Sequence, residues 1–355
     1  MGEKVLMKGN EAIAEAAIAA GCRHFFGYPI TPQTEVAAYM SKRMPKIGGV
    51  YLQGESEVAS INMVLGAGAA GVRVMTSTSS PGISLMAEGI SYIAGSDVPC
   101  LIVNVQRGGP GLGGIQPSQA DYCQATKASG HGDFQMLVFA PSTVQEMVDL
   151  VAGAFELGDK YRMPTMILSD GMLGQMMEPV ELPEAKESTV SDKPWAASGH
   201  QNKRAHNVVN SLYIDPHELE RLVVERYKKY DIIKETEQRA EEYLADDADI
   251  IIVAFGASSR VSRSAIDMAR KQGIKAGLVR PITLWPFPEK YLAKHAGHAK
   301  VFLSVEMSMG QMVDDVKLAI KCSKPVEFFG RTGGVIPTPK EVFEQIVKLS
   351  GGACQ

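Results

Sequence analysis

The stretch FFGYPITPQTE, residues 25–35, joins an apolar run to a helical pattern through a turn that contains two prolines. Pro29 and Pro32 each fix their own backbone angle φ and push the preceding residue towards an extended conformation. We therefore expect a rigid turn between a strand and a helix, which is a good place for a contact with a ligand. The alternative interpretation is an ordinary turn in which Thr31 or Thr34 caps the helix.

Around this turn, short apolar runs alternate with helical patterns over the first half of the chain. Near-continuous apolar strands between helices are typical of a parallel sheet that is covered on both faces, so we predict a doubly wound α/β domain. The predicted strands are 24–27, 50–53, 72–78, 99–105, 135–140 and 164–169, and the predicted helices are 9–20, 36–44, 58–70, 144–157 and one that ends near residue 94.

A change of composition divides the chain after this domain. Proline, serine and charged residues dominate 178–210, and a charged helical pattern with one apolar stripe follows from Asp215 to about Tyr243. A second α/β pattern comes next, with strands at 250–255, 276–279 and 301–305, helices at 261–272 and 312–320, and a proline-rich crossing segment at 280–288. The predicted units are a domain over 1–177, a linker arm and bridging helix over 178–245, and a smaller domain over 246–355.

The composition excludes several classes of partner. The chain has 355 residues, 45% of them hydrophobic, and a net charge of -4, which gives no support to nucleic-acid or anionic-membrane binding. The N-terminus lacks the apolar core of a signal peptide, and no stretch reaches the roughly 20 apolar residues of a membrane span. We therefore expect a cytoplasmic protein with no nucleic-acid or membrane partner.

No metal site is predicted in this chain. His295 and His298 lie three residues apart on a predicted helix, but the neighbouring Lys294 and Lys300 indicate a solvated surface. The cysteines are too far apart in the sequence for an iron–sulfur or structural zinc ligand set. They are Cys22, Cys100, Cys123, Cys322 and Cys354.

Several polar residues follow the ends of predicted strands. They are residues 28–31, Glu55 and Glu57, residues 77–80, and Arg107. In an open parallel sheet, ligands bind beyond the carboxyl ends of the strands, so these residues could line a single crevice.

Each of these features also has a purely structural interpretation. The helix dipole alone stabilises a carboxylate such as Glu57 or Glu55 near a helix N-terminus, and a salt bridge could explain Arg107 at the end of an apolar strand. The glycine-rich loop 108–114 could approach a ligand or simply be flexible. The turns at 170–171 and 256–259 are weak candidates for phosphate loops, because neither carries a complete nucleotide-binding motif.

Taken together, these motifs resemble the α-chain of the 2-oxoacid:ferredoxin oxidoreductases over essentially the whole chain. Within this family the chain is most similar to the α-type subunit of the branched-chain (2-oxoisovalerate) enzyme, mainly through 113–119, and next to the 2-oxoglutarate enzyme. The motifs that carry the resemblance are 28–32, Glu57 with its alanine-rich helix, Arg107 with 108–111, 131–133, 144–146 and 331–334.

The resemblance implies a thiamine diphosphate enzyme with a pyrimidine-side domain followed by a transketolase C-terminal-like domain. Glu57 matches the family glutamate that hydrogen-bonds N1′ of the aminopyrimidine and so promotes removal of the thiazolium C2 proton. The turn residues Tyr28, Pro29 and Ile30 are expected to contact the same cofactor.

The resemblance also implies the substrate contacts. Arg107 would bind the 2-oxoacid carboxylate with its planar fork, and Thr31 would donate a hydrogen bond to the substrate carboxylate or carbonyl. Gly108, Gly109 and Gly111 would form the approach to coenzyme A (CoA) or to a partner subunit. The reaction implied is oxidative decarboxylation of the 2-oxoacid with CoA to acyl-CoA, carbon dioxide and reduced ferredoxin.

Two family features are missing from the chain. The glycine-aspartate-glycine motif for diphosphate and Mg²⁺ is incomplete at Ser169-Asp170-Gly171, and cluster cysteines are absent. The resemblance therefore implies a chain that is inactive alone. It implies a β-type subunit that holds the diphosphate and Mg²⁺, a γ-type subunit, a ferredoxin-like δ subunit with [4Fe–4S] clusters, and an external ferredoxin.

Two other functional classes compete with this hypothesis. A nucleotide-binding dehydrogenase would also have two α/β units and glycine-rich turns, and it would bind NAD as an isolated chain. A non-enzymatic assembly subunit with a degenerate site would tolerate Glu57→Ala in the assembled complex.

Overall fold

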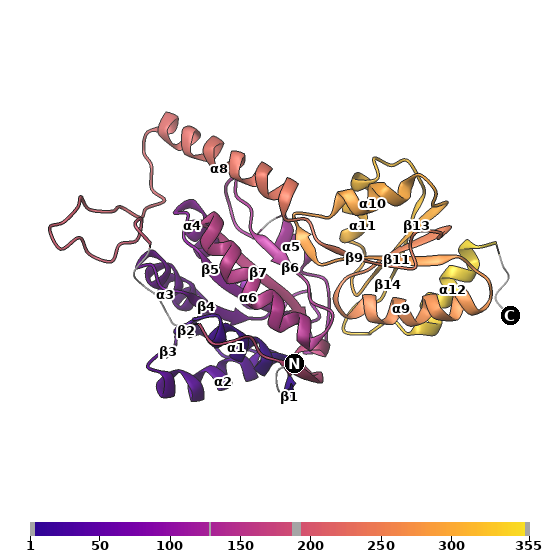
Figure 1. Ribbon diagram of the computed structural model, residues 1–355, viewed down its shortest axis with the longest axis horizontal. Coiled ribbons are helices and arrows are strands. Elements are labelled where there is room, and N and C mark those ends of the chain that lie inside the picture. Colours follow the sequence, from indigo (N-terminus) through magenta and orange to yellow (C-terminus); the bar gives the residue numbers. More distant parts are fainter. Residues whose placement is uncertain (1–3, 128, 187–192, 352–355) are drawn as a thin grey trace.

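Two α/β units lie side by side in the computed structural model, which describes residues 4–127, 129–186 and 193–351 (Figure 1). The larger unit is built mainly from the first half of the chain, and the smaller unit from the C-terminal part. A long charged helix, α8 (Pro216–Thr236), runs along the larger unit towards the smaller one.

A seven-stranded sheet forms the centre of the larger unit. Six of its strands are parallel, and β12 is antiparallel to β6. The order is β12 (Thr283–Trp285), β6 (Leu137–Phe139), β7 (Pro164–Asp170), β5 (Cys100–Gln106), β4 (Val74–Thr78), β2 (His24–Gly27) and β3 (Val50–Gln53). The chain runs outward from β2 to β3 and then returns to the other side of β2 as β4, so the topological switch point lies between β2 and β4.

Helices cover this sheet on both faces, as predicted. One layer contains α1, α2 and α6, where α1 packs against both others, and α3 packs against α4 in the second layer. The bounds are α1 (Gly9–Ala19), α2 (Thr34–Arg43), the 3-10 turn η1 (Met44–Ile47), α3 (Glu57–Ala69), α4 (Ser80–Gly95), α5 (Tyr122–Thr126), α6 (Val144–Tyr161) and α7 (Gly171–Gln175). Gly21, at φ 86°, ends the first helix as the sequence indicated.

A five-stranded sheet forms the smaller unit. Its order is β14 (Val326–Gly330), β13 (Val301–Glu306), β10 (Ile250–Val253), β11 (Ala276–Pro281) and β9 (Ala240–Tyr243), with β9 antiparallel to β11. The helices around it are α9 (Gly256–Lys271), α10 (Glu289–Ala296), α11 (Met312–Ala319) and α12 (Pro339–Leu349). This is the second α/β unit that the sequence predicted.

Two strands cross the predicted domain boundaries, which themselves stay a prediction. The strand β9 belongs to the second sheet although it lies in the predicted linker arm, and β12 joins the first sheet from within the predicted second domain. The bridging helix was expected to reach Tyr243, but it ends at Thr236, and Tyr243 lies in β9. A further two-stranded sheet, β1 (Lys4–Lys8) with β8 (Met177–Glu181), was not predicted.

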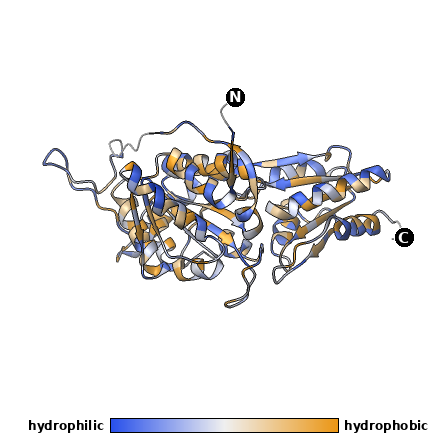
Figure 2. Cartoon of the chain, turned by 90° about the horizontal axis from the view of Figure 1, so that it is seen from below, coloured by the Kyte–Doolittle hydropathy of each residue, from blue (hydrophilic) through white to orange (hydrophobic). Residues whose placement is uncertain are grey.

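Apolar side chains fill the space between the sheets and their helices. Figure 2 shows the apolar residues concentrated in the strands and helices of both units, whereas the loop that projects at the left edge is hydrophilic. None of the helices in the described part of the chain combines the length and apolar character needed to cross a bilayer.

Candidate active site

The turn after β2 is held rigid by a buried amide at the switch point. Gln33 is fully buried, and its Nε2 donates to the Tyr28 carbonyl at 3.1 Å. The Ser77 hydroxyl, on β4, donates to Gln33 Oε1 at 2.6 Å, so the turn is tied across the switch point. From α1, Asn10 Nδ2 donates to the Pro32 carbonyl at 2.8 Å.

The capping interpretation of this turn is wrong. Gln33 occupies the N-cap of α2, and none of the described side chains caps this helix. The Thr34 hydroxyl instead donates to the Ile30 carbonyl at 3.4 Å, and Thr31 is exposed. The sequence singled out the two prolines, but Gln33 is the residue that connects the turn to its neighbours.

Arg107 lies against Thr31, as the sequence predicted. Its side chain leaves the end of β5, and Nη1 donates to the Thr31 carbonyl at 2.9 Å while Nη2 donates to the Leu112 carbonyl at 3.0 Å. Arg107 is only 7% exposed, and its buried Nε has no partner among the described residues. The contact uses the main-chain carbonyl of Thr31, so the role of the Thr31 hydroxyl towards a substrate stays a prediction.

Glu57 is a buried carboxylate at the first position of α3. Ser56 caps this helix by accepting a hydrogen bond from the Ala59 N–H at 3.2 Å, so the cap does not need Glu57. Glu57 is 5% exposed, and we find no hydrogen bond or ion pair to its carboxylate within the described chain. The other candidate, Glu55, is exposed.

An unpaired hydroxyl group, that of Thr78, lies close to Glu57. A Cβ atom added at Gly82 would lie 2.9 Å from Glu57 Oε1 and 1.9 Å from Thr78 Oγ1, so both groups reach the space that this glycine leaves open. The buried hydroxyls of Thr78 and Ser79 lack partners in the described residues. Because buried polar groups are nearly always hydrogen-bonded, a cluster of unpaired ones at the end of β4 indicates a ligand site.

A second network fixes the main chain at Arg107. The Ser80 hydroxyl accepts a hydrogen bond from the Arg107 N–H at 3.0 Å and donates to Asp121 Oδ2 at 2.5 Å. The Asn104 side chain donates to the same carboxylate oxygen at 3.0 Å. Burial raises the pKa of Asp121, while these hydrogen bonds act in the opposite direction. Ser80 lies in the predicted segment 77–80, whereas the role of Asp121 was not predicted.

The segment after Arg107 is fastened to the smaller unit. The Gln119 N–H donates to the Met307 carbonyl at 2.9 Å, the Met307 N–H donates back to Gln119 Oε1 at 3.0 Å, and Gln119 Nε2 donates to the Phe255 carbonyl at 2.7 Å. The Tyr122 hydroxyl donates to Asp315. The position of the Arg107 segment therefore depends on both units.

The two weak phosphate-loop candidates lie in this contact between the units. Asp170 caps α7 by accepting from the N–H groups of Met172 and Leu173. A Cβ at Gly256 would lie 3.0 Å from Gln119 Nε2 and 3.7 Å from Asp170 Oδ2. Burial raises the pKa of Asp170 to about 6. Capping and close packing account for both turns.

The glycine-rich loop closes on itself beyond Arg107. The Gly108 N–H donates to the Gln116 carbonyl at 2.9 Å, and the Gly114 N–H donates to the Gly108 carbonyl at 2.8 Å. A Cβ at Gly113 would lie 1.9 Å from the Gly108 oxygen, so this turn requires glycine. Residues 109–116 are exposed. Contact of Gly108, Gly109 and Gly111 with CoA or a partner subunit stays a prediction.

The expectation for the histidine pair is wrong for His295. This residue is fully buried, because α10 packs its imidazole against β9, where Nε2 lies 2.6 Å from Glu242 Oε1. The Lys294 ammonium lies 2.9 Å from Glu242 and 3.1 Å from Asp246. Of the three potential metal ligands Glu242, Asp246 and His295, both carboxylates are therefore in ion pairs with Lys294.

The family models and the related sequences that match this chain all belong to one enzyme family. A family model described as pyruvate flavodoxin/ferredoxin oxidoreductase, thiamine diphosphate-binding, matches residues 15–254, and pyruvate:ferredoxin oxidoreductase core domain II matches residues 248–342. The ketoisovalerate oxidoreductase subunit VorB of Methanothermobacter thermautotrophicus is 49% identical over 98% of both chains. The 2-oxoglutarate synthase subunit KorA of the same organism is 37% identical and covers 99% of this chain and 100% of its own.

Solved structures agree with this assignment. The 2-oxoglutarate:ferredoxin oxidoreductase from Magnetococcus marinus, with 2-oxoglutarate, coenzyme A and succinyl-CoA bound, superposes with a TM-score of 0.82 at 27% identity, covering 98% of this chain and 65% of that chain. A split-gene transketolase shares the fold, with a TM-score of 0.57 at 14% identity and 98% coverage of both chains. The chain therefore belongs to the thiamine diphosphate-dependent 2-oxoacid:ferredoxin oxidoreductase family, which confirms the resemblance and the fold class predicted from the sequence.

Proposed function

We propose that this chain is the α-type subunit of an enzyme that oxidatively decarboxylates a branched-chain 2-oxoacid with CoA, producing acyl-CoA, carbon dioxide and reduced ferredoxin. The observation that carries the proposal is Glu57, a buried carboxylate without a partner among the described residues. A largely buried carboxylate without a partner in the chain is available to a partner that is supplied from outside it.

The residues around Glu57 fit thiamine diphosphate. The Glu57 carboxyl group would hydrogen-bond N1′ of the aminopyrimidine, and Tyr28, Pro29 and Ile30 would contact the cofactor from the rigid turn at the switch point. When bound, this cofactor supplies the nucleophilic carbon that attacks the keto group of the substrate. Glu57 would hold the hydrogen bond at the aminopyrimidine N1′ and so promote removal of the thiazolium C2 proton.

Arg107 would orient the substrate. A guanidinium has five N–H donors, and the contacts with Thr31 and Leu112 use only two of them. The remaining donors, including the unpaired Nε, can bind a carboxylate as a fork. The Thr31 hydroxyl would donate a hydrogen bond to the same substrate.

The surroundings of Arg107 favour an apolar substrate side chain. A second carboxylate, as in 2-oxoglutarate, would require another cation. The loop 108–119 contains no lysine or arginine and carries Leu112 and Ile115 instead. The name of the VorB relative points to the same class of substrate.

Partner subunits would complete the site. The turn at Asp170 serves as a helix cap, and the five cysteines are scattered along the chain, so diphosphate, Mg²⁺ and [4Fe–4S] clusters would be held by other chains. We propose a β-type subunit for the diphosphate and Mg²⁺, a γ-type subunit, a ferredoxin-like δ subunit and an external ferredoxin, all in the cytoplasm. The exposed loop 109–116 would face CoA or one of these subunits.

The proposal is tested by turnover of the assembled complex with 2-oxoisovalerate, 2-oxoglutarate and pyruvate, in the presence of CoA and a low-potential electron acceptor. We expect the highest kcat/KM for 2-oxoisovalerate. A higher value for 2-oxoglutarate would assign the chain to the other enzyme, whose KorA subunit is the 37% identical relative. Turnover that does not depend on thiamine diphosphate would contradict the whole proposal.

A further inference from the structure

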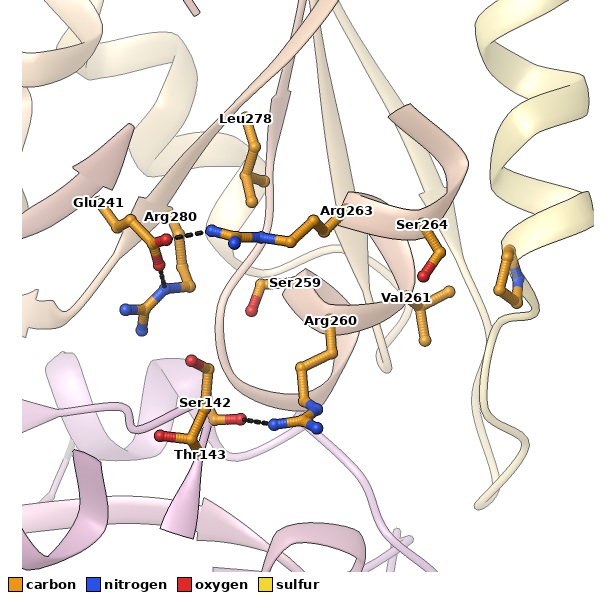
Figure 3. Close-up of a pocket in the computed structure, with 11 residues that line it drawn as sticks. Ser142, Thr143, Glu241, Ser259, Arg260, Val261, Arg263, Ser264, Leu278 and Arg280 are labelled. Carbon is orange, nitrogen blue, oxygen red and sulfur yellow. Dashed lines mark hydrogen bonds and ion pairs between the residues drawn. The ribbon is translucent and has the colours of Figure 1, made fainter. Parts of the chain in front are cut away.

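A cavity of about 460 Å³ lies between the two units, away from the residues of the candidate active site (Figure 3). Ser142 and Thr143, which follow β6 of the larger unit, form one wall. Residues of α9 and β11 of the smaller unit form the other wall. Cavities of this size at a contact between domains are a common place for small ligands.

Arginine side chains are concentrated in the lining of this cavity. Three arginines, Arg260, Arg263 and Arg280, face it, and Glu241 is the one acidic residue among its lining residues in the described chain. The first two turns of α9 contribute Arg260 and Arg263, so the positive end of the helix dipole adds to the potential there.

Carboxylates hold these arginines but leave the cavity open. Glu146 binds Arg280 through two hydrogen bonds of 2.8 and 2.9 Å, and Glu178 lies 3.1 Å from Arg260. Neither of these glutamates lines the cavity. Glu241, which does line it, accepts hydrogen bonds from Arg263 and, at 2.7 Å, from Nε of Arg280. Arg260 also donates to the Ser142 carbonyl at 2.9 Å, across the contact between the units.

Arg263 keeps most of its donors free. Its side chain is 42% exposed. Among the described residues, its guanidinium donates one hydrogen bond, from Nη2 to Glu241. The guanidinium stacks on the Tyr243 ring, with Cζ 4.3 Å from the ring centroid, so its orientation is fixed without consuming N–H groups. Ser259 lies between the arginines in Figure 3.

We propose that this arginine cavity binds a phosphate-bearing small molecule that bridges the two units. Several pre-oriented guanidinium groups match the geometry of phosphate oxygens, and Arg263 keeps N–H donors that its contact with Glu241 does not use. The ligand would contact Arg263 and Arg260 on α9 and the Ser142 and Thr143 wall at the same time. Binding would therefore stabilise the arrangement of the units.

Calorimetric titration of the assembled complex with inorganic phosphate and with ADP tests the proposal. We expect saturable binding of at least one probe and a rise in the melting temperature. Arg263→Gln removes the least engaged arginine, and Ser264→Phe fills the cavity from an exposed helix position while keeping all three arginines. Each variant should weaken binding by at least about tenfold. Lys271→Gln, an equal loss of charge at the exposed end of α9, should bind like the unaltered complex.

The arms of this experiment separate the possible sources of the phosphate. Tighter binding of ADP than of phosphate identifies a nucleotide, and equal binding identifies the phosphate group alone. If saturating CoA displaces ADP and Arg263→Gln raises the KM for CoA, the phosphate belongs to the co-substrate. Absence of binding at millimolar concentrations of both probes, or equal binding by Arg263→Gln and the unaltered complex, would overturn the proposal.

Discussion

Two buried glutamates occupy comparable places in the two units, and their surroundings are opposite. Glu306 ends β13, and its carboxylate accepts hydrogen bonds from two serine hydroxyls and from three main-chain N–H groups at the start of α11. Glu57 begins α3, and no partner for its carboxylate is found in the described residues. A satisfied buried charge stabilises the fold, whereas an unsatisfied one indicates a ligand.

The largest effect is expected from removal of the unsatisfied carboxylate. Glu57→Ala should lower kcat of the assembled complex by about 10³-fold, because proton transfer by a positioned group contributes roughly 10² to 10⁴. Assembly, followed by size-exclusion chromatography, should be preserved because Ser56 still caps the helix. Glu55→Ala, at an exposed neighbouring position, is the matched control. Normal turnover by Glu57→Ala would favour an assembly subunit with a degenerate site.

The satisfied glutamate should respond in the opposite way. Glu306→Ala leaves three main-chain N–H groups of α11 without a partner, which should cost about 3 kcal/mol of stability and lower the melting temperature. The kcat per folded complex, measured well below that temperature, should change by less than about threefold. A loss of kcat as large as that of Glu57→Ala, with normal melting, would break the comparison.

The position of the candidate site could be predicted from local features of the sequence. Apolar runs mark β2, β3 and β5, and the rule that ligands bind beyond the carboxyl ends of parallel strands then places Thr31, Glu57 and Arg107 at one edge. These inferences use only local patterns and a general topology. They do not depend on the identity of the neighbouring side chains.

The features that the sequence did not predict depend on contacts between residues that are far apart in the chain. Gln33 is polar and follows a proline, so its sequence context does not indicate that it is buried. In the structure its side chain is buried and bonded to Ser77, which lies 44 residues away in the sequence. The strand β12 lies in a segment where prolines interrupt the apolar residues, and its pairing with β6 makes it part of the first sheet. His295 is buried against β9, where its imidazole is hydrogen-bonded to Glu242. The helical pattern of the sequence does not reveal this contact.

A smaller loss of activity than that of Glu57→Ala is expected at Arg107, which is only partly satisfied. Arg107→Lys keeps the charge but cannot reach the Thr31 and Leu112 carbonyls and a substrate carboxylate at once, since an ammonium lacks the planar fork. We expect kcat/KM for the 2-oxoacid to fall by about 100-fold, mostly through KM. Binding of thiamine diphosphate should be retained. An unchanged KM would show that the two carbonyls are the whole purpose of this arginine.

Ser80 should show the smallest effect, because it acts on the substrate only through Arg107. Ser80→Ala removes the oxygen that accepts the Arg107 N–H and frees the Asp121 carboxylate from its hydroxyl partner. We expect KM for the 2-oxoacid to rise by about tenfold at nearly constant kcat, in line with the loss of one buried hydrogen bond. Ser84→Ala, at an exposed position of the same helix, is the control. If Ser80→Ala lowers only the melting temperature, Ser80 has a structural role like that of the hydrogen-bond partners of Glu306. The candidate active site would then contain structural residues as well as ligand-binding ones.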